Sequence, residues 1–308
     1  MWTYKIPDCS LIGIAQGTHV ISPYVRRLRL AAEIRALRAK AGLTAVQLAK
    51  GIGRSRADIS RLENGHVVDQ ADVLKILDVC GVDGDEWTKI MTIAREAGET
   101  GWWESFKNMG DRQAVFADLE AGAATIREYQ QVFIPGLLQA QEYALARADP
   151  AAALEPVASG TPDRIAAGRM MRQRMFRRPG GPDYEAIIDE LAIRRLSAPP
   201  AVMKKSLYHV ATLVRDNPKI TLRVLPIDAR IESYATPPMS FTIYTFADPE
   251  DPVVVAVVTI TAEIFLTEPA DVAPYEELFD RLRKQALPEA GSLDVVTEAA
   301  ARLADDSR

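Results

Sequence analysis

The chain has 308 residues, of which 48% are hydrophobic and 26% charged, and its formal net charge is −5 at pH 7. This composition is typical of a globular protein with a full hydrophobic core, and the length favours about two domains. Its two cysteines are too few for a disulfide framework or a zinc cluster. The longest apolar run, Val253 to Ile260, is far shorter than the roughly 20 residues of a membrane-spanning helix. With no signal-peptide pattern, we expect a cytoplasmic protein that does not associate with membranes.

The charge is unevenly distributed along the chain. From Pro23 to His66 there are ten Lys/Arg and three Asp/Glu, a net charge of +7, so the rest of the chain carries −12. A basic module on an acidic body is the asymmetry expected when one part of a protein meets a polyanion.

The first part of the chain is predicted as an N-terminal extension, residues 1–22, followed by an all-α domain, residues 23–98. Leu30, Ile34 and Leu37 share one face of a first helix, which Gly42 ends. The basic VRRLR that follows Pro23 is expected to lead into this helix.

Two short helices follow within the same domain. Thr44 is placed to cap a second helix that stops near Gly51–Gly53, and Ser55 to cap a third. In the third helix Ile59 and Leu62 face inward and the arginines outward. Two helices joined by a tight glycine turn, the second with a basic outer face, suit placement of a helix in a DNA major groove. Two more helices are predicted at Asp69–Cys80 and Asp83–Ala97, which makes a compact five-helix domain.

The remainder is predicted in two parts. Residues 99–160 are expected to form a helical connecting segment, with helices at Arg112–Glu128 and Leu138–Ala148 and an Ala/Pro/Ser/Gly-rich linker at Asp149–Pro162. Within it, Trp102-Trp103 and Phe133-Ile134-Pro135 are interpreted as core anchors that join the domains.

Residues 161–308 are predicted as an α/β regulatory or partner-binding domain, so that the fold class is multidomain: all-α, then α+β with a mixed sheet covered by helices. Its expected strands are YEAIIDE, ITLRVLP, SFTIYTF, VVVAVVTI and AEIFLTE, and its expected helices are Asp163–Phe176, Pro200–Arg215, Asp271–Ala286 and Leu293–Leu303. The first of these helices is basic. We interpret it as a solvated face with Ile165, Met170 and Met171 on the buried side, in preference to a second phosphate-binding or acidic-partner patch.

The segment LTAVQLAKGIGRSRADISRLENG, Leu43 to Gly65, resembles the helix-turn-helix of Cro/C1-type (xenobiotic-response-element) repressors. The shared features are the Leu-Thr start, the Leu-Ala two turns in, the glycine at the turn, the serine that opens the recognition helix and the Ile-Ser-Arg-Leu-Glu-Asn-Gly ending. Ala45 departs from the family, which usually has glutamine there, and Gln47 sits on a different face. The resemblance implies a binding mode on double-stranded operator DNA with no cofactor and no metal.

The resemblance also assigns roles to individual residues. Thr44 and Ser55 would contact phosphates at helix N-termini, and Arg56 and Arg61 would face base edges. The resemblance further implies a thymine-methyl contact by Ala57, phosphate contacts by Asn64 and His66, an electrostatic role for Arg54, and a structural pair between Arg38 and Glu63.

The rest of the chain resembles a family of antitoxin-like transcriptional regulators of filamentous, high-GC bacteria. The residues that carry this resemblance are Gly101-Trp102-Trp103, Leu119-Glu120-Ala121, Ile126, Tyr129, the run from Ile134 to Gln139, Tyr143-Ala144, Arg172-Gln173, Asp189-Glu190, the run from Ile220 to Pro226, Tyr275 and the run from Phe279 to Leu282. The resemblance implies a DNA-binding regulator that often acts with a small cognate partner protein.

An enzymatic second domain is not expected. Its strand–helix order loosely resembles half of a phospholipase D-like protein, but that chemistry needs a histidine followed two residues on by lysine. None of His19, His66 and His209 has this neighbour, and no phosphate loop, nucleophile elbow or H-E-x-x-H motif occurs. Asp189-Glu190 are interpreted as solvated capping carboxylates.

Three hypotheses follow. The first is a sequence-specific, homodimeric DNA-binding regulator that inserts the Ser55–Leu62 helix into the major groove and binds a partner or effector through its C-terminal domain. The second is an antitoxin-like interaction protein that sequesters a small partner and regulates its own gene. The third is a small-molecule-sensing or enzymatic C-terminal domain.

Overall fold

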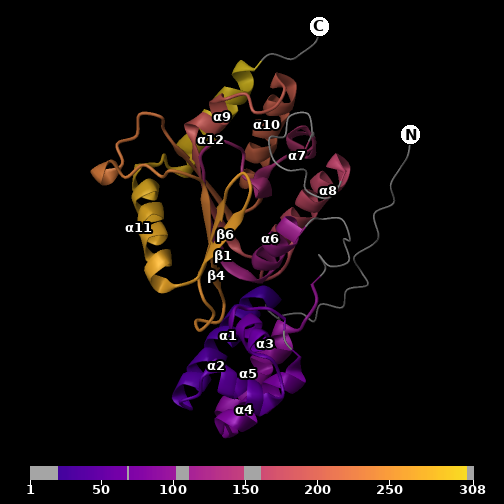
Figure 1. Cartoon of the computed structure of the whole chain (residues 1–308). Helices are drawn as coiled ribbons and strands as arrows, with labels where there is room; N and C mark the ends of the chain where they lie inside the picture. Colours follow the sequence, from indigo (N-terminus) through magenta and orange to yellow (C-terminus); the bar gives the residue numbers. More distant parts are fainter. Residues whose placement is uncertain (1–19, 68, 102–110, 149–160, 304–308) are drawn as a thin grey trace, which may run out of the picture.

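The computed structural model describes residues 20–67, 69–101, 111–148 and 161–303 (Figure 1). Most of the predicted N-terminal extension, Trp102-Trp103 and nearly all of the 149–162 linker lie outside the described residues. Among the described residues, no helix has both the length and the apolar character needed to cross a bilayer.

The five predicted N-terminal helices are confirmed, and they lie together below the sheet in Figure 1. They are α1 (Pro23–Lys40), α2 (Ala45–Ile52), α3 (Arg56–Glu63), α4 (Gln70–Cys80) and α5 (Gly84–Ala97). Their apolar stripes meet in one core because residues three and four apart share a helix face. The core consists of Leu30, Ile34, Leu37, Leu48, Ala49, Ile52, Ile59, Leu62, Val73, Ile76, Leu77, Ile90, Ile93, Ala94 and Ala97.

Helix α1 begins earlier than its apolar stripe predicts. The Ser22 hydroxyl accepts a hydrogen bond from the Val25 N–H at 3.1 Å, and Pro23 occupies the first helical turn, where its missing N–H costs nothing. The basic VRRLR is therefore part of the helix and not a lead-in. The apolar stripe does not include this turn, because Val25 packs in the core of the other domain.

The C-terminal domain is built on one mixed sheet in the order β3-β2-β1-β4-β5-β6. Its strands are β1 (Ala123–Gln130), β2 (Asp183–Asp189), β3 (Ile220–Leu225), β4 (Phe241–Phe246), β5 (Val254–Val258) and β6 (Glu263–Leu266). Strands β1, β2 and β3 are parallel, and β4, β5 and β6 continue the sheet antiparallel. The α+β class and all five predicted strands are confirmed.

Strand β1 corrects the predicted helix at 112–128 and the interpretation of residues 99–160 as helical. Helix α6 ends at Gly122, and the chain continues as the strand that joins the parallel and antiparallel halves of the sheet. In the sequence the helical spacing of α6 runs into Ala123, which hides the boundary. The strand is selected by its neighbours on both sides, because pairing with β2 and β4 outweighs local helix preference.

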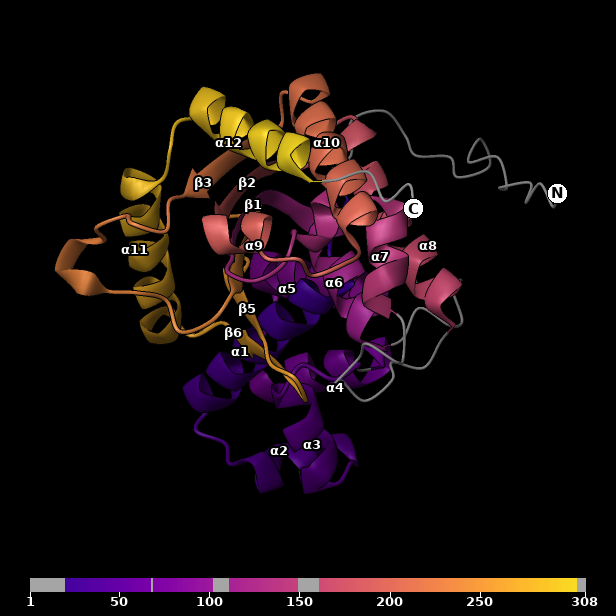
Figure 2. The same cartoon turned by 90° about the horizontal axis from the view of Figure 1, so that it is seen from above.

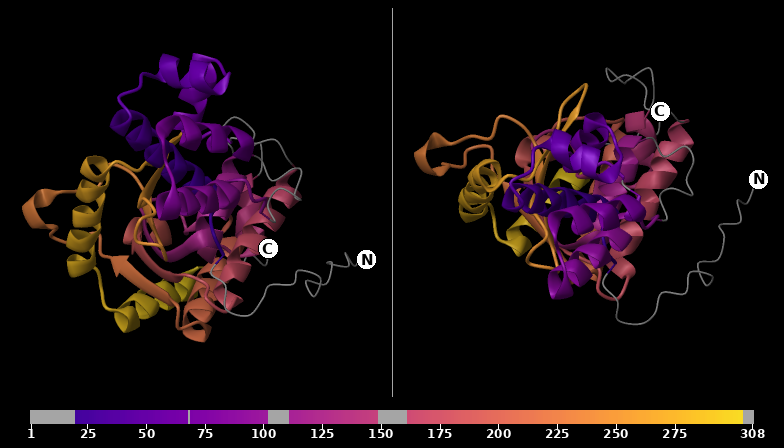
Figure 3. Two further views of the ribbon diagram at one scale, coloured as in Figure 1. Left: turned by 90° about the horizontal axis from the view of Figure 1, so that it is seen from below. Right: turned by 60° about the horizontal axis from the view of Figure 1, so that its bottom comes forward.

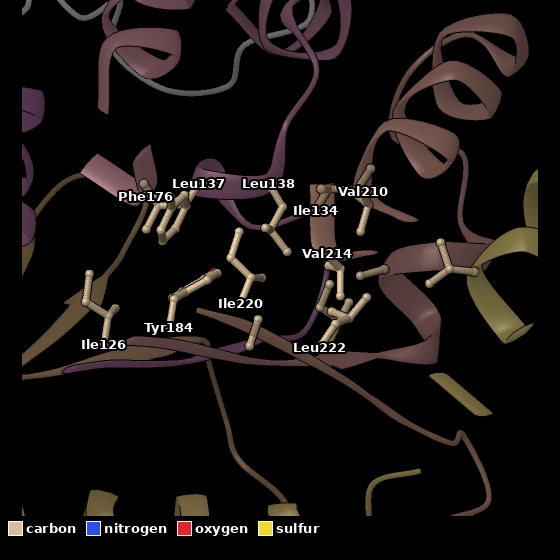
Figure 4. Close-up of a cluster of buried hydrophobic side chains, with 14 of the residues drawn as sticks. Ile126, Ile134, Leu137, Leu138, Phe176, Tyr184, Val210, Val214, Ile220 and Leu222 are labelled. Carbon is tan, nitrogen blue, oxygen red and sulfur yellow. The ribbon is translucent and has the colours of Figure 1, made fainter. Parts of the chain in front are cut away.

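Helices cover both faces of this sheet (Figure 2). One face carries Ile126, Tyr184, Ala186 and Leu222 and packs against α10 (Pro200–Asp216) and α12 (Glu289–Arg302) (Figure 4). The alternate residues on the other face pack against α11 (Pro269–Gln285) through Phe279 and Leu282. The remaining helices are α6 (Asp111–Gly122), α7 (Gln141–Ala148), α8 (Pro162–Arg172) and α9 (Glu190–Arg194), with short 3₁₀ turns at Gly136–Leu138, Gln173–Arg177 and Glu232–Tyr234.

The basic segment after residue 162 is only in part the solvated face predicted for it, because Arg164, Arg174 and Arg177 are exposed but Arg172 and Arg178 pack against α6. The side chain of Arg172 is only 12% exposed, and its guanidinium forms two hydrogen bonds with the carboxylate of Glu120 on α6, one of them 2.7 Å from Nε to Oε2. Arg178 donates to the backbone carbonyl of Ala121 at 2.8 Å. Ile165 is buried as expected. These arginines hold α6, because a buried charge is tolerated only with a matched partner.

The two domains are joined by ion pairs from the first turns of α1. The guanidinium of Arg26 lies 3.0 Å from Asp248 and 2.8 Å from Asp251, in the loop between β4 and β5. Arg29, one turn on, contacts Asp248, Glu250 and Asp251. Figure 3 shows the helical domain against the end of the sheet. Burial alone would raise the pKa of Asp248, but the Glu250 N–H and the two guanidiniums outweigh it and lower the pKa to about 2.

Replacement of Arg29 by alanine should destabilise the whole chain. Its side chain is 5% exposed and Asp251 is 7% exposed, so the substitution leaves a buried carboxylate short of a cation. We expect a loss of about 2–4 kcal/mol in urea unfolding. Lys40→Ala is the matched control, because its pair with Glu86 is 72% and 48% exposed and should cost less than about 1 kcal/mol. Equal losses in the two variants would contradict a structural role for the Arg29 cluster.

Candidate nucleic-acid interface

Helices α2 and α3 form a helix–turn–helix with caps on both N-termini. Gly53 takes a left-handed conformation, φ 69°, which lets the chain turn tightly out of α2. Thr44 accepts the Gln47 N–H at 3.2 Å while the Gln47 side chain accepts the Thr44 N–H at 2.8 Å. Ser55 and Asp58 repeat this reciprocal arrangement at α3, at 3.2 Å and 2.9 Å. The two capping boxes hold both helix N-termini rigid and exposed.

The capping contacts limit what Thr44 and Ser55 can do as predicted phosphate ligands. Each hydroxyl also donates to the side chain of its capping partner, at 2.9 Å for Thr44 and 2.7 Å for Ser55. The groups that these N-termini leave available for a phosphate are therefore the remaining backbone N–H groups and the positive end of the helix dipole. Ala45 is half-buried against the helical core, whereas Gln47 is exposed and used by the cap.

The outer face of α3 is open to solvent. Ile59 and Leu62 are buried, and the exposed positions of the helix and its cap are Arg56, Ala57, Ser60, Arg61 and Asn64. Among the described residues Arg56 has no hydrogen-bond or ion-pair partner, so its guanidinium is available for a ligand. It stands in the first turn of α3, the part of a recognition helix that reaches base edges.

The two predicted base-reading arginines do not share one face. Residues five apart on a helix are separated by about 140°. Arg61 is also held by an ion pair with Asp58. Hydrogen bonds from the Ser55 hydroxyl and N–H and from Arg61 lower the pKa of Asp58 to about 2. Asp58 is thus a fixed negative charge beside the exposed face of α3.

Of the other residues predicted to contact DNA, some already bond to protein groups and one does not. Arg54 Nε donates to Asp72 at 2.8 Å, so this cation is tied to α4. Asn64 caps α3 and its amide donates to the Ser60 carbonyl at 2.6 Å. His66 follows α3 and is exposed. Of these three side chains, His66 is the open one.

A partly buried group of hydrogen bonds holds α3 against α1. Arg38 donates to both carboxylate oxygens of Glu63, at 2.5 Å and 3.2 Å, and to the Leu43 carbonyl at 3.0 Å. Arg35 adds a hydrogen bond to the Glu63 carbonyl at 2.7 Å. The structure therefore brings Arg38 and Glu63 together as the family resemblance implies. These contacts fix the C-terminal end of α3, opposite the Ser55 cap.

The local charge of +7 overstates what faces a polyanion. Arg26 and Arg29 are buried in the contact with the other domain, 8% and 5% exposed. Their charges are balanced by the carboxylates of the loop between β4 and β5. The cations that stay exposed lie on α2 and α3, in the turn between them and on the C-terminal half of α1, so the basic surface is smaller than the sequence suggests.

Comparison with known families agrees with this division of the chain. A model described as a helix-turn-helix domain matches residues 29–88, and one described as "Domain of unknown function (DUF5753)" matches residues 113–298. The chain belongs to the DUF5753 family. No curated protein matches it. The DUF5753 match starts in α6 and includes β1, in keeping with the central place of β1 in the sheet.

Two residues beside the exposed face of α3 were not predicted from the sequence of this DUF5753 protein. Asp58 was visible as the fourth residue of a Ser-x-x-Asp pattern, which resembles the Ser/Thr-x-x-Glu/Gln signature of a capping box. Arg35 had no such signal, because its partner is a backbone carbonyl 28 residues away.

Replacement of Arg56 by alanine should weaken binding to a selected genomic operator about 5- to 150-fold and relax its sequence preference, as loss of a bidentate base contact does. The measurement is fluorescence anisotropy against the operator and a scrambled duplex. Arg95→Ala on α5 removes the same charge from an exposed position outside α2 and α3, and serves as control. Wild-type affinity in the Arg56 variant would overturn its assignment.

Asp58→Asn should strengthen DNA binding about threefold, because it removes an exposed carboxylate next to the phosphates and releases Arg61. With a pKa of about 2, this carboxylate stays charged over the usual assay range, so acidification cannot mimic the substitution. Asp78→Asn, an exposed site on α4, is the matched control. Weaker operator binding by the Asp58 variant at unchanged helicity would show that the Asp58–Arg61 pair orients Arg61 for the bases.

Proposed function

We propose that the protein is a sequence-specific transcription regulator of the Cro/C1 type that acts in the cytoplasm. The observation that carries the proposal is the outer face of α3, which is exposed, rigidly capped and headed by Arg56, a cation with no partner in the described part of the chain. In this proposal α3 lies in the major groove with Arg56 at the base edges, and the N-termini of α2 and α3 hold phosphates.

The proposed regulator is a homodimer. One helix–turn–helix reads only a half-site, and a two-fold pair of recognition helices doubles the contacts and the specificity. The two half-sites should lie one helical turn, about 34–36 Å, or a multiple of it apart.

Footprinting on genomic fragments tests the mode of binding, with light scattering of the free and DNA-bound protein. We expect a palindromic footprint and a dimer on the DNA. A single half-site bound by a monomer would contradict the dimer, and the absence of any preferred fragment would contradict specific binding.

The C-terminal domain is proposed to bind an effector or partner and not to catalyse a reaction. The described histidine of this domain, His209, lies on α10, where burial lowers its pKa and its Nε2 has no hydrogen-bond partner among the described residues. A catalytic histidine normally stands within hydrogen-bond reach of its co-catalyst.

An antitoxin-like partner protein is the second candidate, and an exposed loop favours it. In the loop between β3 and β4, Ile227 is 73% and Tyr234 90% exposed. Ser233 and Tyr234 both adopt positive φ, 57° and 55°, a strained backbone that is common at binding sites. The orange loop projects beside α11 in Figure 2. Loss of a co-purifying small protein from Tyr234→Ser, but not from Tyr208→Ser on α10, would support this role.

A further inference from the structure

The DUF5753 domain contains a cavity of about 490 Å³ on the face of the sheet opposite α11. This volume is in the range of small-molecule sites. The cavity lies against β1 and β4, where Glu128 and Tyr244 point to the same side of the sheet, and α6 and α8 complete its walls. Apolar and aromatic groups from Phe116, Phe133 and Ile165 line it together with the polar ones.

Glu128 is a buried carboxylate that makes no ion pair within the described part of the chain. The residue is 6% exposed. Its hydrogen bonds come from neutral donors, the Tyr184 hydroxyl at 2.6 Å and the Gln130 amide at 2.8 Å. The buried cation in this region, Arg172, directs its Nε and Nη2 groups to Glu120 instead. Burial raises the pKa of Glu128, and the two neutral hydrogen bonds oppose this only in part.

Gln113 supplies a second acceptor to the same cavity. Its residue is 9% exposed, and its amide oxygen is buried with no hydrogen-bond partner. Buried acceptors in folded proteins are nearly always satisfied, so an orphaned one in the wall of a cavity indicates a missing donor. Glu128 and Gln113 are thus two buried acceptors in the wall of this cavity, and the first of them can carry a negative charge.

The cations of the cavity do not offer a comparable anion site. Arg172 is paired with Glu120, and Arg169 donates to the Gln139 side chain at 2.9 Å. Arg147 lies flat on the Phe133 ring, with its guanidinium carbon 3.7 Å from the ring centre. An anionic ligand would also have to approach Glu128. The buried acceptors of Glu128 and Gln113 therefore favour a cation.

We propose that this cavity binds a small organic amine, with the ammonium group paired to Glu128 and an N–H or O–H of the same molecule donated to Gln113. The apolar body of the amine packs between Phe116, Phe133 and Ile165. The inference rests on the proposed function, since it names the chemical class of the effector, but the site itself is independent of DNA binding.

The test uses the full-length protein without DNA and compares amines with their matched alcohols. The amines are tryptamine and phenethylamine, and their matched alcohols are tryptophol and 2-phenylethanol. Binding of each is measured by thermal shift and calorimetry. We expect at least one amine to raise the Tm by about 5 °C at a hundred times its Kd, and its alcohol to bind at least tenfold more weakly. Amines that bind no better than their alcohols would overturn the proposal.

Two variants place the amine in the cavity. Glu128→Gln should weaken amine binding at least tenfold and leave alcohol binding unchanged. Gln113→Met should weaken amine binding and raise the Tm of the free protein, because it removes an unsatisfied acceptor. Glu142→Gln, an exposed carboxylate on α7 outside the cavity, is the control and should bind like the wild type.

These experiments distinguish a failure of the amine site from a failure of the DNA-binding function. Undiminished amine binding in both variants overturns the proposed site. If Glu128→Gln does not fold, the Gln113 variant decides alone: weaker binding supports the site and unchanged binding overturns it. A protein that binds the amine but no genomic fragment would contradict the DNA-binding function and leave the amine site standing.

Discussion

Helix α1 is the constraint on which the rest of the structure depends, because it is buried on two sides. Val25 belongs to the core of the sheet domain, whereas Ile34 and Leu37 belong to the core of the helical domain. Between these two contacts, Arg26 and Arg29 are matched to carboxylates more than 200 residues away in the chain. A rigid helix that is packed in two cores cannot move in one of them without losing contacts in the other. The position of the DNA-binding unit is therefore set by the fold of the DUF5753 domain.

A second link runs through α6. On one side of this helix Phe116 and Glu120 line the cavity. On another side Asp118 accepts hydrogen bonds from the Ser22 hydroxyl and, at 3.2 Å, from the Tyr24 N–H at the start of α1. The approach is close: a Cβ on Gly122 would lie 2.6 Å from the Ser22 backbone nitrogen, so no larger residue fits there. A molecule in the cavity would therefore touch the helix that holds α1, one packed element from the recognition unit.

Local patterns account for the parts that were predicted well. The helices of the N-terminal domain were predicted because caps such as Thr44 and Ser55 and apolar residues at helical spacing act within one or two turns of the chain. The strands from β2 to β6 were predicted because alternation and β-branched residues are equally local. The same local logic failed at β1, where Ala123 prolongs a helical pattern into a strand that only its two neighbours select.

By itself, the sequence determined the helix–turn–helix, the exposed arginines of α3 and the two-part organisation, since all of these depend on residues close together in the chain. Only the tertiary structure decided which charges are free. Residue type alone does not distinguish Arg29 and Arg172 from Arg56. The first two are largely enclosed against carboxylates, whereas the third faces solvent. The physical reason is that a charge is buried only when the fold brings its partner to it, and the partners of Arg29 and Arg172 lie 52 to 222 residues away.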